Sequence, residues 1–282
     1  MKTGLVLEGG AMRGLFSMGI CDVLMEQGIT FDGLIGVSAG AVFGCNIKSH
    51  QRGRAIRYNT KYCKDPRYCS FRSLIKTGDL FGVDFCYHEL PEKLDIFDKE
   101  TYEASSLPFY VVCTDVETGQ AVYHLCENNI KKDILWMQAS ASMPLASRIV
   151  EIDGKPYLDG GVADSIPLRY FQSIGYEKNI VILTQPKGYV KGKNKALPLM
   201  KRAFRKYPDF LNTIAHRHEV YNATSAYIED QEQQGTTLVL RPKVPLPVGR
   251  VEHDAAKLRA AYDLGRECAK EHWEEILSFM EK

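Results

Sequence analysis

Short apolar runs alternate with segments of helical periodicity along the first part of the chain. The run at 4–9 predicts a buried strand, and residues 12–28 carry apolar side chains at helical spacing before they stop at a glycine. A second apolar run at 31–38 predicts another buried strand, and 39–50 predicts a helix rich in small residues. This alternation of strands and helices favours a layered α/β fold.

The alternation resumes after one irregular stretch. Residues 50–105 show no sustained periodicity and are basic and aromatic, so we expect a variable, cap-like segment there. No linker or repeat follows, so we expect a single domain over 1–282 that a helical portion at 187–282 completes. The later elements that the pattern predicts are strands at 108–116 and 120–126, a helix at 131–143, a hairpin over 148–161, a helix at 165–175, a strand at 179–186, a long helix over 207–230, a strand at 236–242 and a closing helix over 254–280.

Composition and charge exclude several classes of protein. The 282 residues are 45% hydrophobic and 25% charged, and the formal net charge is +1, which gives no reason to expect a nucleic-acid partner. The eight cysteines show neither a C-x-x-C pair nor the spacing of a zinc site, so we expect reduced thiols and no metal. We also expect no leader, because the first strand follows Met1 almost directly, and no membrane span. These features predict a cytoplasmic protein.

The stretch G-V-S-A-G at 36–40 carries the first candidate chemistry. A nucleophilic serine at the end of a strand must project its hydroxyl from a sharp turn into a helix, and glycines two residues before and after allow close backbone approach. Gly36, Ser38 and Gly40 fit this pattern, although a structural turn would fit it too. In ordinary α/β-hydrolases several strands precede the serine. Only two precede Ser38, so we expect a different fold.

The stretch E-G-G-A-M-R-G at 8–14 carries the second candidate chemistry. It lacks the lysine of a phosphate-binding P-loop, and Ala11 occupies the place of the middle glycine of a dinucleotide fingerprint. Such a turn does align N–H groups at a helix N-terminus, where they cradle an anion. With a candidate serine one strand away, the natural anion is the tetrahedral oxyanion of acyl transfer. Arg13 would contact that anion or hold the loop by bonding its backbone carbonyls.

Asp159 is the candidate base. It ends a short predicted strand, and Gly160 and Gly161 follow it, so another backbone can approach closely. A carboxylate within hydrogen-bond reach can accept a serine proton directly. An ordinary Asp-Gly turn is the alternative. The histidines stand in no recognisable motif, and we expect His216 and His218, with Arg217 between them, to form a solvated helix face.

These three motifs, in this order, resemble the patatin-like phospholipase family. The glycine-rich loop at 8–14, the nucleophile elbow at 36–40 and the motif Asp159-Gly160-Gly161 are similar to its signature. Two weaker segments, 114–124 and 139–161, also look like members of this family, and the motifs together span about 4–170.

The resemblance implies a fold, an activity and a set of roles. It implies a three-layer α/β/α sandwich with a central, mostly parallel sheet, and hydrolysis of fatty-acyl esters of lipids without a cofactor. Ser38 would be the nucleophile and Asp159 the base, with no histidine. Glu8 and Ala11 depart from members whose loop begins with aspartate and three glycines, but alanine still supplies an N–H. By the same resemblance the oxyanion hole would consist of Gly9, Gly10, Ala11 and Met12, and the supporting residues would be Arg13, Gly14, Gly36, Gly40, Gly160 and Gly161.

Other functions stay open at this point. A carboxylesterase or acyl thioesterase would use the same chemistry on small soluble esters, and a non-catalytic lipid-binding module would keep the fold alone. Residues 48–76 and 187–207 are rich in lysine and arginine with interleaved apolar side chains. They would form either a solvated basic surface or a peripheral contact with an anionic membrane at its inner face.

Overall fold

One mixed sheet forms the centre of the molecule. The computed structural model describes residues 1–281; Lys282, the last residue of the expected domain, lies outside the described residues. The sheet has the strand order β5-β6-β3-β2-β1-β7-β8, and β4 pairs with β3 beside this path. The pairings from β3 through β2, β1 and β7 to β8 are parallel, and those of β4, β5 and β6 are antiparallel. The strands are β1 (Thr3–Leu7), β2 (Gly33–Val37), β3 (Phe109–Asp115), β4 (Ala121–Leu125), β5 (Val150–Ile152), β6 (Lys155–Asp159), β7 (Lys178–Ile182) and β8 (Thr237–Leu240).

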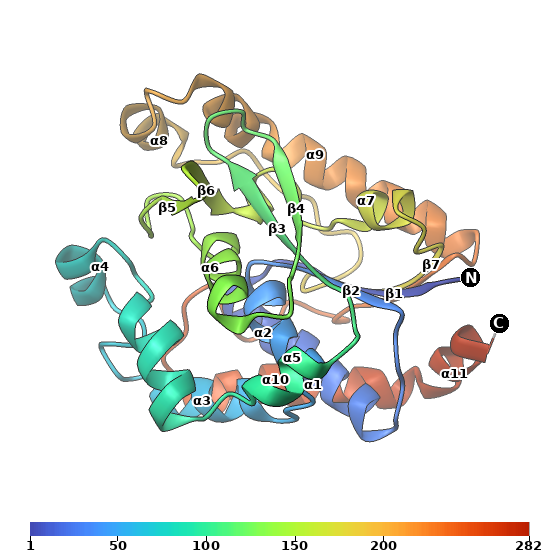
Figure 1. Ribbon diagram of the computed structural model, residues 1–282. Coiled ribbons are helices and arrows are strands. Elements are labelled where there is room, and N and C mark those ends of the chain that lie inside the picture. Colours follow the sequence, from blue (N-terminus) through green and yellow to red (C-terminus); the bar gives the residue numbers. More distant parts are fainter. Residues whose placement is uncertain (282) are drawn as a thin grey trace.

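Helices cover both faces of this sheet, which confirms the expected three-layer α/β/α fold. Helices α7 and α9 lie on one face, and α1, α2 and α10 lie on the other (Figure 1). The sheet separates a large cluster of buried apolar side chains against α1, α2 and α10 from a smaller one against α7 and α9. A third, small cluster includes Leu158 of β6 and Phe210 of α9. The helices are α1 (Gly14–Glu26), α2 (Ala39–Lys48), α3 (Arg54–Tyr62), α4 (Phe71–Thr77), α5 (Lys99–Ala104), α6 (Ile130–Ser140), α7 (Leu168–Ser173), α8 (Leu197–Ala203), α9 (Pro208–Gln233), α10 (Ala255–Glu271) and α11 (Trp273–Glu281).

The pairing of β3 brings two distant strand ends together. Strand β2 pairs with β3 as far as Val112, and β6 pairs in the opposite direction from Asp115 to Cys113. Strand β4 pairs with residues 110–114 of β3 and overlaps both, so β2 and β6 must share the other edge. Because β2 and β6 approach each other head-on along this edge, the residues that follow Val37 and end β6 meet.

The segment 50–105 is not irregular as expected. It contains α3, α4, α5 and a π-helix, η2 (Phe85–Leu94). Each of these elements is short, so none carries the sustained apolar periodicity that identifies a helix in a sequence. The expected closing helix over 254–280 is also interrupted, because α10 ends before His272 and α11 begins at Trp273.

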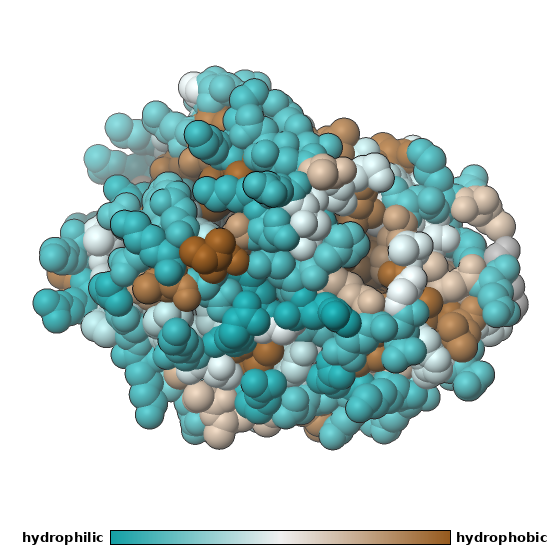
Figure 2. Space-filling model, turned by 60° about the horizontal axis from the view of Figure 1, so that its bottom comes forward, coloured by the Kyte–Doolittle hydropathy of each residue, from teal (hydrophilic) through white to brown (hydrophobic). Residues whose placement is uncertain are grey.

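The described surface has no large apolar platform on the face that Figure 2 shows. Hydrophilic residues cover most of that face, and hydrophobic residues appear on it in small separate groups (Figure 2). Across residues 1–281, none of the helices combines the length and the apolar character that crossing a bilayer requires.

Candidate active site

Ser38 occupies a sharp turn between β2 and α2. Its φ of 55° lies in the left-handed region, which costs a non-glycine residue about 1–3 kcal/mol. The flanking glycines are required by packing, because a Cβ on Gly36 would lie 2.3 Å from the Gly40 carbonyl oxygen. A Cβ on Gly40 would in turn lie 2.6 Å from the Leu7 carbonyl oxygen. Ser38 stands immediately before the N-terminus of α2.

Ser140 anchors the backbone of this turn to β3. Its hydroxyl accepts a hydrogen bond from the Ser38 N–H at 2.8 Å and donates one to the Val112 carbonyl at 2.6 Å. Ser140 is fully buried at the end of α6. Sequence analysis included Ser140 in a helix but assigned it no role, since periodicity does not reveal which hydroxyl faces the sheet.

Asp159 meets Ser38 at the junction of β2 and β6. The Ser38 hydroxyl donates to Asp159 Oδ2 at 2.7 Å, and both residues are only 7% exposed. The other carboxylate oxygen, Oδ1, accepts the Gly161 N–H at 2.7 Å. A Cβ on Gly160 would lie 2.0 Å from the Val112 carbonyl oxygen, so only glycine allows β3 to approach this turn. The two predicted residues are therefore in direct contact, 121 positions apart along the chain.

The surroundings of Asp159 act on its pKa in opposite directions. Burial raises the pKa of Asp159, while the Ser38 hydroxyl, the Arg217 charge and the Gly161 N–H lower it, and the net shift is upward. Arg217 also donates to the Gly161 carbonyl through Nε. The expectation that Arg217 belongs to a solvated face is wrong, because α9 turns this side chain toward the loop after β6.

No imidazole accompanies the pair. Within residues 1–281, no histidine nitrogen forms a hydrogen bond with Ser38 or Asp159, and Asp159 is the only side chain bonded to the Ser38 hydroxyl. The same part of the chain contains no group of three His, Cys, Asp or Glu residues arranged to hold a metal ion.

The four expected oxyanion donors differ in their availability. The Gly9 N–H bonds the Ser165 carbonyl and the Met12 N–H bonds the Arg250 carbonyl, both at a long 3.4 Å. The N–H groups of Gly10 and Ala11 have no acceptor among the described residues. Ala11 adopts a φ of 48° and lines the same pocket as Ser38. Gly10 and Ala11 are thus the two donors that are free to bind an anion.

Glu8, at the start of the loop, holds it against the sheet, whereas the Arg13 side chain does not. Glu8 accepts the Tyr221 hydroxyl at 2.7 Å and the Thr184 hydroxyl at 3.0 Å, so a long-range bond from α9 fixes the start of the loop. Gly14 begins α1. Arg13 does not bond the loop carbonyls through its side chain; its Nε is buried and has no hydrogen-bond partner among residues 1–281.

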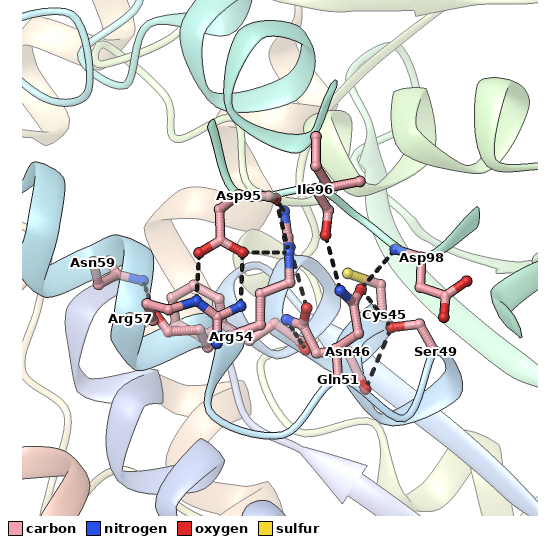
Figure 3. A network of polar contacts seen from close by, with 12 residues as sticks. Cys45, Asn46, Ser49, Gln51, Arg54, Arg57, Asn59, Asp95, Ile96 and Asp98 are labelled. Atoms are coloured by element: carbon pink, nitrogen blue, oxygen red, sulfur yellow. Dashed lines mark hydrogen bonds and ion pairs between the residues drawn. The ribbon is translucent and has the colours of Figure 1, made fainter. Parts of the chain in front are cut away.

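An apolar pocket leads away from Ser38. It is partly open to solvent, and most of its wall comes from α2, α6 and the 54–97 segment. Arg54 forms part of this wall, but its guanidinium is already bonded to Asp95 O at 2.8 Å and Asn46 Oδ1 at 3.1 Å. Figure 3 shows Arg57 pointing at the side-chain carboxylate of Asp95, which its Nε reaches at 2.7 Å. These bonds fix the 54–97 segment to α2.

Comparison with known proteins gives two family matches. A model of the patatin-like phospholipase family matches residues 5–171, and a model of a domain of unknown function, DUF6363, matches residues 207–281. The uncharacterized protein YjjU of Escherichia coli K12 is 27% identical, over 95% of this chain and 76% of its own length. The lysophospholipase nte1 of Aspergillus terreus is 26% identical over 98% of this chain, which spans only 18% of that relative. The crystal structure of VipD from Legionella pneumophila matches with a TM-score of 0.46 and 13% identity, over 96% of this chain and 67% of VipD.

Proposed function

The chain belongs to the patatin-like phospholipase family, and we propose that it is a serine lipid acyl hydrolase that uses Ser38 and Asp159 as a catalytic dyad. The observation that carries this proposal is the 2.7 Å hydrogen bond between the Ser38 hydroxyl and Asp159 Oδ2 at the start of an apolar pocket. Family membership supports lipid hydrolysis in general terms, and the lysophospholipases among the relatives support an ester of a lysolipid or phospholipid as substrate.

The first half-reaction forms an acyl-enzyme. Ser38 Oγ attacks the ester carbonyl carbon while its proton moves to Asp159 Oδ2. The raised pKa of Asp159 makes this carboxylate a stronger base than an exposed aspartate. The N–H groups of Gly10 and Ala11 stabilise the oxyanion, and such donors each contribute about 3–4 kcal/mol. The tetrahedral intermediate then expels the alcohol or lysolipid, which takes the proton from Asp159.

The second half-reaction releases the fatty acid. A water molecule attacks the acyl carbonyl and gives its proton to Asp159. The same N–H groups hold the second oxyanion, and its collapse returns the proton to Ser38 Oγ. The apolar wall of the pocket, with Val42, Phe43 and Met137 among its residues, suits a hydrocarbon chain throughout.

Hydrolysis kinetics test the dyad. We expect Ser38→Ala and Asp159→Asn each to lower kcat/KM on lysophospholipids by about 10⁴-fold or more, as for the nucleophile or the acidic residue of other serine hydrolases. Ser17→Ala is the matched control, because the Ser17 hydroxyl is buried without a hydrogen-bond partner and its loss should be nearly neutral. Activity retained in Ser38→Ala or Asp159→Asn would refute the dyad. Turnover of short soluble esters with none on lysophospholipids would favour a carboxylesterase or thioesterase.

We also propose that part of the expected basic surface makes a peripheral contact with an anionic membrane. Phe71 and Ile75 are 79% and 86% exposed, and they lie one helical turn apart on α4. Arg72 and Lys76 flank them, and each cation near an anionic bilayer contributes about 1 kcal/mol. The basic stretch is only partly available for this, because the Lys48 amine is buried and donates to two backbone carbonyls.

Vesicle sedimentation tests this contact. The double variant Phe71→Ser/Ile75→Ser should bind vesicles of anionic phospholipid at least tenfold more weakly than the wild type, and added salt should weaken wild-type binding. Val244→Ser, at another exposed apolar position, is the control. Salt-independent binding, or equal binding by the double variant, would contradict the proposed contact.

A further inference from the structure

Four cationic residues surround the proposed oxyanion loop, namely Arg13, Lys191, Arg217 and Arg250. Arg13 belongs to this loop, and the carbonyl of Arg250 accepts the Met12 N–H from it. Arg217 donates to the Gly161 carbonyl, next to Asp159. The Lys191 amine lies 4.0 Å from the ring centre of Tyr221, whose hydroxyl bonds Glu8 at the start of the loop.

These cations act on one another. The pKa of Lys191 falls to about 7, first because of burial and then because of the charges of Arg217, Arg250 and Arg13, against the opposing charge of Glu8. The pKa of Arg217 is lowered as well, mainly by burial and in part by Arg250, against the opposing charges of Asp159 and Glu8. Such mutual effects require the charged groups to be near neighbours.

No carboxylate neutralises this group through an ion pair. In residues 1–281, none of the four cations has an aspartate or glutamate oxygen within 4.0 Å, although twelve other such pairs occur there, all at other cations. Two carboxylates, Glu8 and Asp159, oppose the four cations from beyond this distance, which leaves an excess of positive charge. The Nε of Arg13 is buried without any acceptor. Like charges held together in this way are destabilising on their own and favour a bound anion.

We propose that Lys191, Arg217 and Arg250, together with Arg13, bind the phosphate group of the ester substrate. This inference rests on the proposed function and adds a head-group preference to it. Guanidinium groups bind phosphate oxygens through paired, charge-assisted hydrogen bonds, and an ammonium adds a point charge. In a glycerophospholipid, one glycerol unit separates the phosphate from the acyl ester, so the phosphate lies only a few bonds from the carbonyl that Ser38 would attack.

Three of these cations come from outside the segment that matches the family model. Lys191, Arg217 and Arg250 all follow residue 171, and Arg217 and Arg250 lie within the DUF6363 match. The C-terminal part of the chain would therefore determine which head group the catalytic part accepts.

Lys191 and Arg250 are the residues to change. Arg217 bonds the Gly161 carbonyl and Arg13 lies in the glycine-rich loop, so their loss would also disturb Asp159 or the oxyanion donors. We would compare 1-hexanoyl-glycerophosphoglycerol with monohexanoylglycerol, which share an acyl ester and differ in the phosphate. Both would be assayed below their micelle-forming concentrations, at pH 6 and low salt.

The readout is the ratio of kcat/KM for the phosphate ester to kcat/KM for the neutral ester. Lys191→Met and Arg250→Gln should each lower this ratio about tenfold or more, mainly through a higher KM for the phosphate ester. Lys201→Met and Arg202→Gln remove cations of the same kinds from the exposed surface of α8 and should leave the ratio within twofold of wild type. An unchanged ratio in both Lys191→Met and Arg250→Gln would overturn the inference.

A binding measurement separates this inference from the proposed function. In calorimetric titration at pH 6, inorganic phosphate should bind the Ser38→Ala protein and should bind Ser38→Ala/Lys191→Met at least tenfold more weakly. If that result came with no hydrolysis of any ester by the wild type, the phosphate site would stand and the hydrolase proposal would fail. If the wild type hydrolysed both esters and Ser38→Ala bound no phosphate, the inference would fail alone.

Discussion

Removal of the Ser140 hydroxyl should damage both stability and catalysis. This hydroxyl bridges the Ser38 N–H and the Val112 carbonyl, at 2.8 and 2.6 Å, and Ser140 is fully buried. In Ser140→Ala the Ser38 N–H would lose its acceptor at a position where both residues are buried. The turn at Ser38 would then be linked to β3 through the pairing of Val37 with Val112 and through Asp159.

The expected magnitudes follow from these two bonds. A buried donor left unsatisfied costs about 1–3 kcal/mol, and the weakened pairing of the Val112 carbonyl adds about 1 kcal/mol. We therefore expect Ser140→Ala to lower the free energy of unfolding by about 2–4 kcal/mol. Because the same bond orients the nucleophile, kcat should fall by about 10- to 100-fold, as small misplacements of a reacting group do elsewhere.

Ser142→Ala is the matched control. Ser142 lies two residues away, just beyond the end of α6, and is 5% exposed; its hydroxyl donates to the Gln138 carbonyl of α6 at 2.8 Å. Its loss should cost less than about 1 kcal/mol. Urea unfolding at 25 °C and p-nitrophenyl ester kinetics measure both quantities. If Ser140→Ala and Ser142→Ala matched each other in unfolding free energy and in kcat, the reasoning about the bridge would be refuted.

Three further predictions concern the loop, the base and the head-group site. Ala11→Gly should raise the free energy of unfolding by about 0–1 kcal/mol in urea titration and keep activity within about threefold. The reason is that glycine removes the strain of a φ of 48° and retains the N–H; a loss of stability above 1 kcal/mol would contradict this. Burial raises the folded-state pKa of Asp159, so its contribution to stability is present below its ordinary pKa and is lost as pH rises through the raised value. Asp159→Asn should therefore unfold at higher urea concentration than the wild type at pH 8 and lose this advantage toward pH 4; lower stability at pH 8 would count against it. The preference for a phosphodiester over a neutral ester should decline as pH rises through about 7, where Lys191 loses its proton, and Lys191→Met should show no such decline.

The sequence predicted the helices in which apolar residues recur at helical spacing over several turns. Residues 12–28 correspond to α1 at Gly14–Glu26, and the long helix expected over 207–230 is α9 at Pro208–Gln233. Periodicity did not predict the helices within 50–105, because they are short and some of their apolar side chains face solvent. Phe71 and Ile75 of α4, for instance, indicate no buried stripe.

The candidate site was predictable where the chemistry demands particular residues at strand ends. The glycines around Ser38 and after Asp159 are required by close backbone contacts, so they leave a recognisable spacing. Ser140 and Arg217 leave none, because a helix places their functional atoms through packing against distant segments. The roles of Ser38 and Asp159 stay predictions until kinetics test them.

Labelling with a fluorophosphonate tests the central claim most directly. The reagent forms a covalent bond with an activated serine, and peptide mass spectrometry identifies the modified residue. The account predicts stoichiometric labelling of the peptide that contains Ser38, much slower labelling in Asp159→Asn, and none in Ser38→Ala. Labelling of a different serine, or equal labelling of the Asp159→Asn protein, would contradict it.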